Sequence, residues 1–264
     1  MFEHISYGVY IKTILTFASG GAVWEGFKFL YPEINRYFDS KRLATSSFYK
    51  NLDPILKSAG ELYGKLLSLA KEDFSTFTNP NYSNSPDPVQ NKKYIYYLFS
   101  QFWAQLENLR LESQYSALSK IKKGNQLLRF IETFESRKFR ILDRSMQRMI
   151  GECLITQKGQ TFRIMSLNEF MIQFEDINSI LYARVSKLEL VFLSLGKNEN
   201  RQTILKFGVI IAALLNHFDP KYQTVRKRNI YLNKLNEDTK KSIRTLLVKD
   251  YLPFLKESEK YHKT

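Results

Sequence analysis

Apolar residues are most concentrated near the N-terminus, in a segment that runs from Ile5 to Tyr31. Between Ile5 and Trp24 the only charged residue is Lys12. A helix of about 20 residues rises roughly 30 Å, which matches the hydrocarbon core of a bilayer. Trp24 and Tyr31 lie where interfacial aromatic side chains are expected. The pattern therefore predicts an N-terminal helix that spans a membrane.

Two other interpretations of this segment remain open. One is a helix buried in the protein core or in an oligomer, and the other is a helix that lies in the headgroup layer. Lys12 counts against a span, because a charge in mid-membrane costs about 2.5–3.5 kcal/mol on insertion scales. For a span, Glu3 before it and the basic residues after it predict an N-terminus outside and a body in the cytoplasm. Without a span, the whole protein is expected to be cytoplasmic.

Small residues recur every four positions within this segment, at Ala18, Ala22 and Gly26. This spacing places them on one stripe of a helix, where a second helix can approach closely. The three residues are candidate helix-packing positions, and they predict a homo-oligomer. The alternative explanation is chance, since small residues are common in apolar helices.

The pattern becomes more polar after Pro32, where a helix is expected to run to about Lys50. Asp53 followed by Pro54 then has the features of a new helix start. A carboxylate can cap the first turn, and proline is favoured at the first helical position. The sequence therefore predicts two successive helices in this region.

The second of these helices is amphipathic. From Leu56 to Phe74 its apolar residues recur at helical spacing. On its exposed side, Lys57 and Lys65 each stand four residues from Glu61, a spacing that favours ion pairs. Residues 32–78 are therefore expected to connect the N-terminal helix, residues 1–31, to the rest of the chain.

Residues 79–90 are rich in Asn, Ser and Pro and form the best linker in the chain. Residues 91–264 are expected to form a basic helical domain. Its predicted helices are a helix from about Asn91 past Tyr115, then Leu127–Glu152, Leu167–Glu175, Ile177–Leu195 and Gln202–Phe218, with a charged helical tail from Lys221.

Two local signals refine this all-α prediction. A short β-hairpin is expected near residues 152–165, around Lys158-Gly159. Ser166 with Glu169 forms a capping box that opens the helix after it. The run Phe207–Leu215 is apolar but too short to span a membrane, so it predicts a buried core helix.

Composition narrows the class of partner. Of 264 residues, 44% are hydrophobic, which is enough for a substantial core, and the formal net charge is +14. Such an excess attracts nucleic acid or nucleotide, anionic lipid or an acidic protein. A single cysteine and three scattered histidines provide little material for a disulfide framework or a metal site.

A basic cluster lies in the middle of the chain. Its members are Arg137, Lys138, Arg140, Arg144 and Arg148. The last three are spaced by four residues and would share one helical stripe, from which guanidinium groups can grip phosphates. Acidic residues within a turn, at Glu135, Asp143 and Glu152, offer the alternative of structural ion pairs, which we favour.

A second basic cluster is formed by Arg226, Lys227 and Arg228, with further cations after it. Tyr222 and Tyr231 flank it, as stacking residues do in single-strand nucleic-acid binders. The sequence carries no signature of a nucleic-acid-binding fold, so we favour a solvated helix face. Both clusters are candidate anion-binding sites.

Sequence signatures of enzymes are missing. The chain has no G-x-x-x-x-G-K-[ST] phosphate loop, no G-x-S-x-G elbow and no H-E-x-x-H zinc motif. Adjacent carboxylates such as Glu72 and Asp73 do not converge on one helical face. We therefore predict no catalytic residue, metal or cofactor and favour a non-enzymatic protein.

Two functions are compatible with these patterns. The first is a membrane-anchored helical protein that oligomerises and binds an anionic partner, as a scaffold, sensor or membrane effector. This layout resembles that of several bacterial membrane-bound sensors and effectors, including immune effectors, and its partners would be lipid, further copies or another protein. The alternative is a soluble module that binds nucleic acid or nucleotide, with the N-terminal helix buried in its core.

Overall fold

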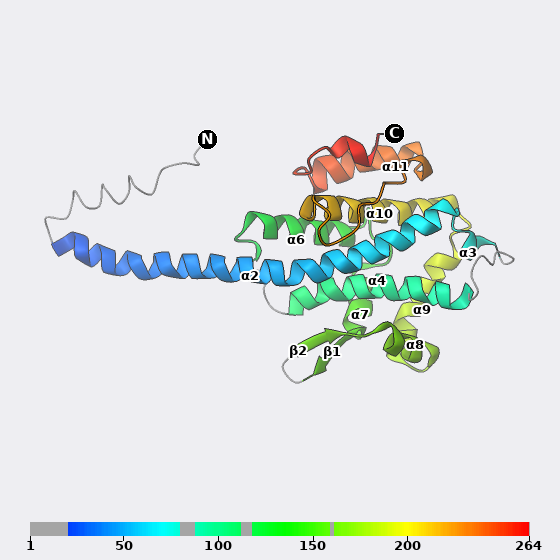
Figure 1. The fold of residues 1–264 in the computed structure, drawn as a ribbon, viewed down its shortest axis with the longest axis horizontal. Helices are drawn as coiled ribbons and strands as arrows, with labels where there is room; N and C mark the ends of the chain where they lie inside the picture. The colour runs from blue at the N-terminus through cyan, green and yellow to red at the C-terminus, as the bar shows by residue number, and fades with distance from the viewer. Residues whose placement is uncertain (1–20, 80–87, 112–117, 159–160, 264) are drawn as a thin grey trace.

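The computed structural model describes residues 21–79, 88–111, 118–158 and 161–263, and for residues 21–29, 158 and 161 it describes the backbone alone. The protein is mostly helical with one small two-stranded sheet, which confirms the all-α prediction (Figure 1). The helices are α2 (Gly21–Lys71), α3 (Ser75–Thr78), α4 (Pro88–Leu111), α6 (Lys122–Glu135), α7 (Arg144–Cys153), α8 (Leu167–Glu175), α9 (Ile180–Leu193), α10 (Asn198–Phe218) and α11 (Glu237–Ser242).

Shorter elements complete the chain. Strands β1 (Ile155–Lys158) and β2 (Thr161–Ile164) connect α7 to α8. A 3₁₀ turn η1 (Leu232–Lys234) precedes α11, and a π-helical segment η2 (Ile243–Tyr251) and a second turn η3 (Ser258–Tyr261) follow it.

The body is organised around α2, α4 and α10. Helix α2 packs against both of the others, and α4 also packs against α7 on its far side (Figure 1). Aromatic side chains fill the space between these helices. Phe207 on α10 lies 5.6 Å from Phe99 and 5.0 Å from Phe134, measured between ring centroids. The predicted burial of the apolar run on α10 is confirmed, because Phe207 and Val209 are fully buried.

Helix α2 is one continuous helix, with Pro32 and Pro54 inside it. The predicted helix start at Asp53 is therefore wrong. Asp53 Oδ2 instead lies 2.7 Å from Lys57 Nζ on the exposed side. An internal proline removes one backbone hydrogen bond, but burial of the neighbouring apolar side chains against the body outweighs that loss.

The two halves of α2 have different surroundings. The C-terminal half packs in the body, whereas the N-terminal half extends beyond it (Figure 1). We call this N-terminal part, residues 21–43, the arm. From the helical rise, the whole helix is about 75 Å long. The arm carries exposed apolar side chains, among them Leu30 and Tyr31.

The predicted helix from Leu127 to Glu152 is wrong, because the chain breaks it into α6 and α7. Residues 136–143 form a turn between the two helices. Phe139 in this turn is fully buried, and its backbone N–H donates to the Ser136 carbonyl at 3.0 Å. Burial of this aromatic side chain favours the turn over a continuous exposed helix.

The local signals around the hairpin are confirmed. Strands β1 and β2 pair antiparallel, with Ile155 opposite Ile164. Ser166 caps α8, because its hydroxyl accepts from the Glu169 N–H and the Glu169 carboxylate accepts from the Ser166 N–H. The expected helical pattern from Lys221 is wrong for residues 221–231, which are not helical.

No helix in the described part of the chain is long and apolar enough to cross a membrane. Most of the predicted span, including Ala18, lies outside the described residues. Its end, with Ala22 and Gly26, forms the first turns of α2. The described residues thus give the transmembrane prediction no support, and it stays a prediction.

Candidate anion-binding site

The first basic cluster is not one helical stripe. Arg144 and Arg148 lie on α7, whereas Arg140 lies in the turn before it and forms an ion pair with Asp143. Arg137 and Lys138 are exposed in the same turn. The break between α6 and α7 therefore separates residues that the sequence spacing had placed on one face.

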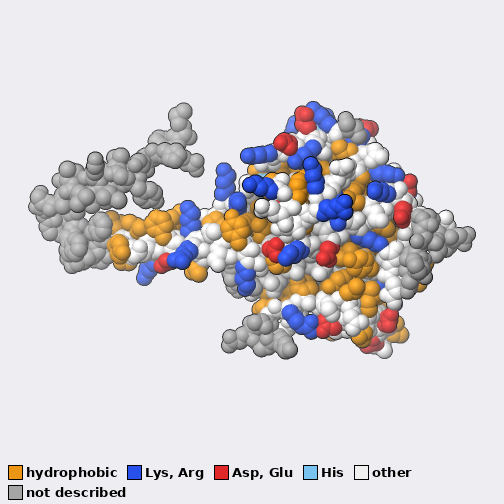
Figure 2. All heavy atoms as spheres, viewed as in Figure 1, with side chains coloured by type: hydrophobic (Ala, Val, Ile, Leu, Met, Phe, Trp, Pro, Cys, Tyr) orange, Lys and Arg blue, Asp and Glu red, His pale blue; other side chains and the backbone are white. Residues whose placement is uncertain are grey.

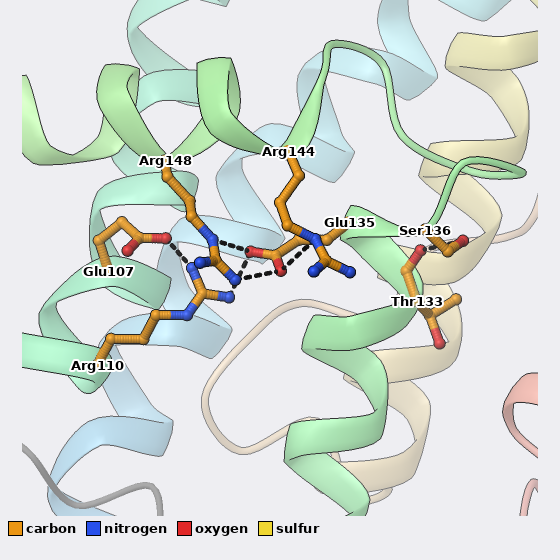
Figure 3. A network of polar contacts seen from close by, with 7 residues as sticks. All are labelled: Glu107, Arg110, Thr133, Glu135, Ser136, Arg144 and Arg148. Carbon is orange, nitrogen blue, oxygen red and sulfur yellow. Dashed lines mark hydrogen bonds and ion pairs between the residues drawn. The ribbon is translucent and has the colours of Figure 1, made fainter.

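Three arginines converge on Glu135 at the end of α6 (Figure 3). Arg148 donates to both carboxylate oxygens, from Nε to Oε1 at 3.2 Å and from Nη2 to Oε2 at 2.9 Å. Arg144 Nε lies 3.4 Å from Oε2, and Arg110 on α4 forms a further ion pair with Oε1. Arg110 also pairs with Glu107 one turn earlier on α4. This network ties α4, α6 and α7 together.

The two carboxylates of the network respond to burial in opposite ways. Burial raises the pKa of Glu107 above its ordinary value, although the charges of Arg110 and Arg148 act in the opposite direction. Burial also acts to raise the pKa of Glu135, but hydrogen bonds and charges from Arg148 and Arg110 outweigh it and lower that pKa. Of these two carboxylates, Glu135 is the one whose ionised form the folded protein stabilises.

Arg144 and Arg148 spend part of their donor capacity on Glu135, which is the structural pairing that the sequence had suggested. In a second contact, Lys206 Nζ donates to the backbone carbonyl of Lys138 at 3.4 Å. These contacts hold the α6–α7 turn against α4 and α10. An anion-binding role for this cluster stays a prediction, with the exposed Arg137 and Lys138 as its most accessible members.

The second basic cluster lies in an ordered, non-helical segment, residues 219–231, which we call the strap. The buried Asp219 carboxylate organises its start. Asp219 Oδ1 accepts from the backbone N–H of Gln223 at 2.8 Å, and Oδ2 accepts from those of Thr224 and Val225 at 2.9 and 3.0 Å. One carboxylate thus satisfies three backbone donors, which replaces the hydrogen bonds that a helix would provide.

The strap crosses α2 at two glycines one turn apart. A Cβ on Gly60 would lie 2.6 Å from Val225 Cγ1, and a Cβ on Gly64 would lie 1.9 Å from Arg228 Nη1. Both distances are too short for any other residue unless the facing side chain of the strap moves. Arg228 Nη1 also donates to the Gly60 carbonyl at 2.5 Å. Because the two glycines have no side chain, the basic cluster can pack directly against α2.

Two buried tyrosines fix the end of the strap. The Tyr63 hydroxyl on α2 donates to the Asn229 carbonyl at 3.0 Å, and the Tyr231 hydroxyl donates to the Leu205 carbonyl at 3.3 Å. Burial raises the pKa of both phenols, so both remain protonated donors at neutral pH. The strap is held at its start, middle and end.

A groove of about 800 Å³ lies between the strap and α2. Cationic side chains from both elements line it, and Figure 2 shows Lys and Arg gathered on the face where the strap crosses the body. These cations are Lys65 and Lys71 from α2 and Arg226, Lys227 and Arg228 from the strap. Among the described residues that line the groove, Glu61 is the only acidic one, and Tyr94 of α4 adds an aromatic wall.

The sequence did not single out the α2 side of this groove. Lys65 was expected to pair with Glu61, but in the described part of the chain it hydrogen-bonds to Asn91 Oδ1. The other expected pair is also absent there, because Lys57 contacts Asp53. The four-residue spacing of Gly60 and Gly64 was the available signal, since two glycines on one face of an amphipathic helix mark a close approach.

Other candidate chemistry is sparse. No group of three or more His, Cys, Asp or Glu that could hold a metal ion occurs in the described ranges. Cys153 is half-buried, and burial raises the pKa of its thiol, so it is a weak nucleophile. The Nε2 atom of His217 lies 3.1 Å from Gln126 Oε1, and the His217 ring packs among aromatic rings.

No protein-family model, curated protein or solved structure matches the chain.

Proposed function

We propose that the protein is a non-enzymatic, membrane-attached helical protein that self-associates and binds an anionic partner, as a scaffold, sensor or effector. The observation that carries this proposal is the arm of α2, whose large apolar side chains are uncovered in the single chain. The exposed fractions are 61% for Leu30, 57% for Tyr31, 48% for Ile34, 59% for Tyr37 and 46% for Phe38.

These side chains share one side of the arm. At about 100° per residue they fall within an arc of roughly 120°. Buried residues further along α2, such as Phe48, Leu52 and Ile55, fall within the same arc. The stripe that packs into the body thus continues onto the arm, where its large side chains are exposed. Contiguous exposed apolar surface of this kind is typical of an interaction site.

Charge and sequence favour a membrane as one surface that meets the arm. The arm carries Arg36, Lys41 and Arg42, which suits anionic headgroups, and Figure 2 shows such cations beside its apolar side chains. The apolar residues from Ile5 onward precede it. Attachment at this end would hold the body and its basic groove close to the membrane.

Alkaline carbonate extraction of membranes from cells that express the full chain tests this proposal. The protein is expected in the membrane pellet, because apolar burial resists removal by high pH. A variant with Leu30→Ser, Ile34→Ser and Phe38→Ser should shift towards the soluble fraction. A matched variant with Ile172→Ser, Ile177→Ser and Leu190→Ser removes comparably exposed apolar residues from the body and should not. Complete release of the unaltered protein would contradict membrane attachment.

A soluble nucleic-acid- or nucleotide-binding module is the second candidate. The observation that favours it is the groove, where five cations meet one carboxylate. Binding would then fall steeply with salt, since each phosphate contact releases counterions. A complete lack of binding to single- or double-stranded nucleic acid and to nucleotide at low salt would remove this candidate.

A further inference from the structure

The groove between the strap and α2 has the chemistry of a defined site for a phosphorylated small molecule. We infer that it binds the terminal phosphate group of such a ligand, between the strap cations and the lysines of α2. This inference rests on the anion-binding part of the proposed function and does not depend on membrane attachment.

The first argument is that the cationic side of the groove is ordered before any ligand arrives. Asp219 holds three backbone N–H groups of the strap, and Tyr63 holds the Asn229 carbonyl. The strap also packs closely against α2 at Gly60 and Gly64. A preordered site loses less conformational entropy on binding than a mobile basic loop.

The second argument is that donors remain available in the groove. Lys71 and Arg226 are both exposed and have no polar partner among the described residues. Arg228 donates from Nη1 to the Gly60 carbonyl, and a guanidinium group retains further N–H donors that can bind an anion. In the Glu135 network, by contrast, Arg110, Arg144 and Arg148 each already direct donors to a carboxylate. A phosphate with several acceptor oxygens matches this supply of donors.

The third argument concerns Lys65 at the edge of the groove. Its ammonium group is half-buried, and burial lowers its pKa, with the charge of Glu72 acting in the opposite direction. Its polar partner in the described chain is the neutral Asn91 side chain rather than a carboxylate. An incoming dianion would therefore compensate a partly desolvated cation.

Size and shape restrict the ligand. A volume of about 800 Å³ is within the range of small-molecule sites. Tyr94 provides a wall on which a planar or cyclic group can pack. Terminal phosphate groups attached to such a body occur on free nucleotides and on phosphorylated inositol lipids, so both sources are included in the test.

Isothermal titration calorimetry with the full-length chain tests this site with three probes: inorganic phosphate, ATP, and vesicles that contain phosphatidylinositol 4-phosphate. Saturable binding of ATP or of these vesicles is expected, with weaker binding of inorganic phosphate. The double variant Lys71→Gln and Arg226→Gln should weaken the affinity by about tenfold or more, because it removes two charged donors. Both side chains are exposed and neither has a polar partner among the described residues, so this variant should fold normally.

The matched control is Lys122→Gln with Lys187→Gln, which removes the same charge from exposed positions outside the groove. Equal loss of binding in the control would reveal a nonspecific charge effect and overturn the proposal. Absence of binding to all three probes would overturn it as well. Binding of a single-stranded RNA alone, without ATP or vesicles, would overturn it in favour of the nucleic-acid module. Carbonate extraction reports on the arm alone, so failures of the two proposals are distinguishable.

Discussion

Glu135 and Glu107 differ in how their charges are compensated, although they lie in one network. Glu135 accepts two hydrogen bonds from Arg148 and pairs with two further arginines. The ion-pair partner of Glu107 is Arg110. A buried charge with several partners is costly to remove, whereas a buried charge with one partner is already poorly compensated.

We expect Glu135→Gln to lower the free energy of unfolding by about 3 kcal/mol, because the amide removes the negative charge that three arginines share and places an N–H donor against a guanidinium group. Glu107→Gln should cost clearly less, since the neutral amide avoids the desolvation of a carboxylate and can still accept from Arg110. Urea unfolding followed by circular dichroism measures both. Equal losses for the two variants would contradict this ranking.

The pH dependence of stability should separate the same two residues. The folded protein lowers the pKa of Glu135, so the stability it contributes is complete above the unfolded value of 4.5 and declines as the pH falls through the folded pKa. The folded protein raises the pKa of Glu107, so its contribution is present at low pH and declines as the pH rises through the folded pKa. The stability difference between the unaltered protein and Glu135→Gln should therefore shrink from pH 7 towards pH 3. A difference that stays constant over this range would contradict the assignment.

Among the elements, the contact between the strap and α2 depends on Gly60 and Gly64 in different ways. The Gly60 position faces Val225, whose backbone is held by Asp219, whereas the Gly64 position faces the flexible end of Arg228. The strap can adjust to an added methyl group more easily at the second position than at the first.

Gly60→Ala is therefore expected to destabilise the protein. The steric cost of the added methyl group should exceed the gain in helix propensity, which is about 1 kcal/mol. Gly64→Ala should leave stability nearly unchanged but displace the Arg228 guanidinium and weaken phosphate-ligand binding. Thermal unfolding and calorimetric titration distinguish the two effects. Gly196→Ala is a suitable control, because a Cβ at Gly196 meets nothing within 4 Å. The reverse ranking, with Gly64→Ala the less stable variant, would contradict the packing of the strap against these two glycines.

Element boundaries show how far local sequence signals reach. The capping box at Ser166 and the hairpin of β1 and β2 were predictable, because each depends on residues a few positions apart. Two boundaries were predicted wrongly. A helix start was predicted at Asp53 where α2 is continuous, and a continuous helix was predicted at Phe139 where the chain forms a turn. A proline signal was overridden by packing along α2, and a helical pattern was interrupted so that Phe139 could be buried.

At the scale of the whole molecule, self-association remains a prediction. It draws on the exposed stripe of the arm and on the small residues Ala22 and Gly26 in the first turns of α2. If two arms pack through the small residues, a large side chain there would hold the helices apart.

Gly26→Leu should therefore reduce the fraction of oligomer by severalfold in detergent, as measured by chemical cross-linking and light scattering. Asn35→Leu lies nine residues further on the opposite side of the helix and is the control for added bulk. An unchanged oligomer in Gly26→Leu, or equal losses in both variants, would exclude the small-residue stripe as the packing surface.

The candidate site shows the same division between local and long-range information. Arg226, Lys227 and Arg228 were identifiable as a charged run, but their partners Lys65 and Lys71 lie more than a hundred residues earlier. Conversely, Arg144 and Arg148 were grouped with Arg140 by their spacing, although the turn before α7 separates Arg140 from them.

The sequence by itself determined the helical class, the buried apolar run of α10, the hairpin and the positive charge, because these depend on composition and short-range periodicity. Only the tertiary structure decided which cations are neutralised and which face a groove. That outcome depends on where the Asp219 carboxylate and the two glycines of α2 place the strap. It also decided that the apolar stripe of α2 extends past the body, since exposure depends on which part of a continuous helix packs against the rest of the described chain.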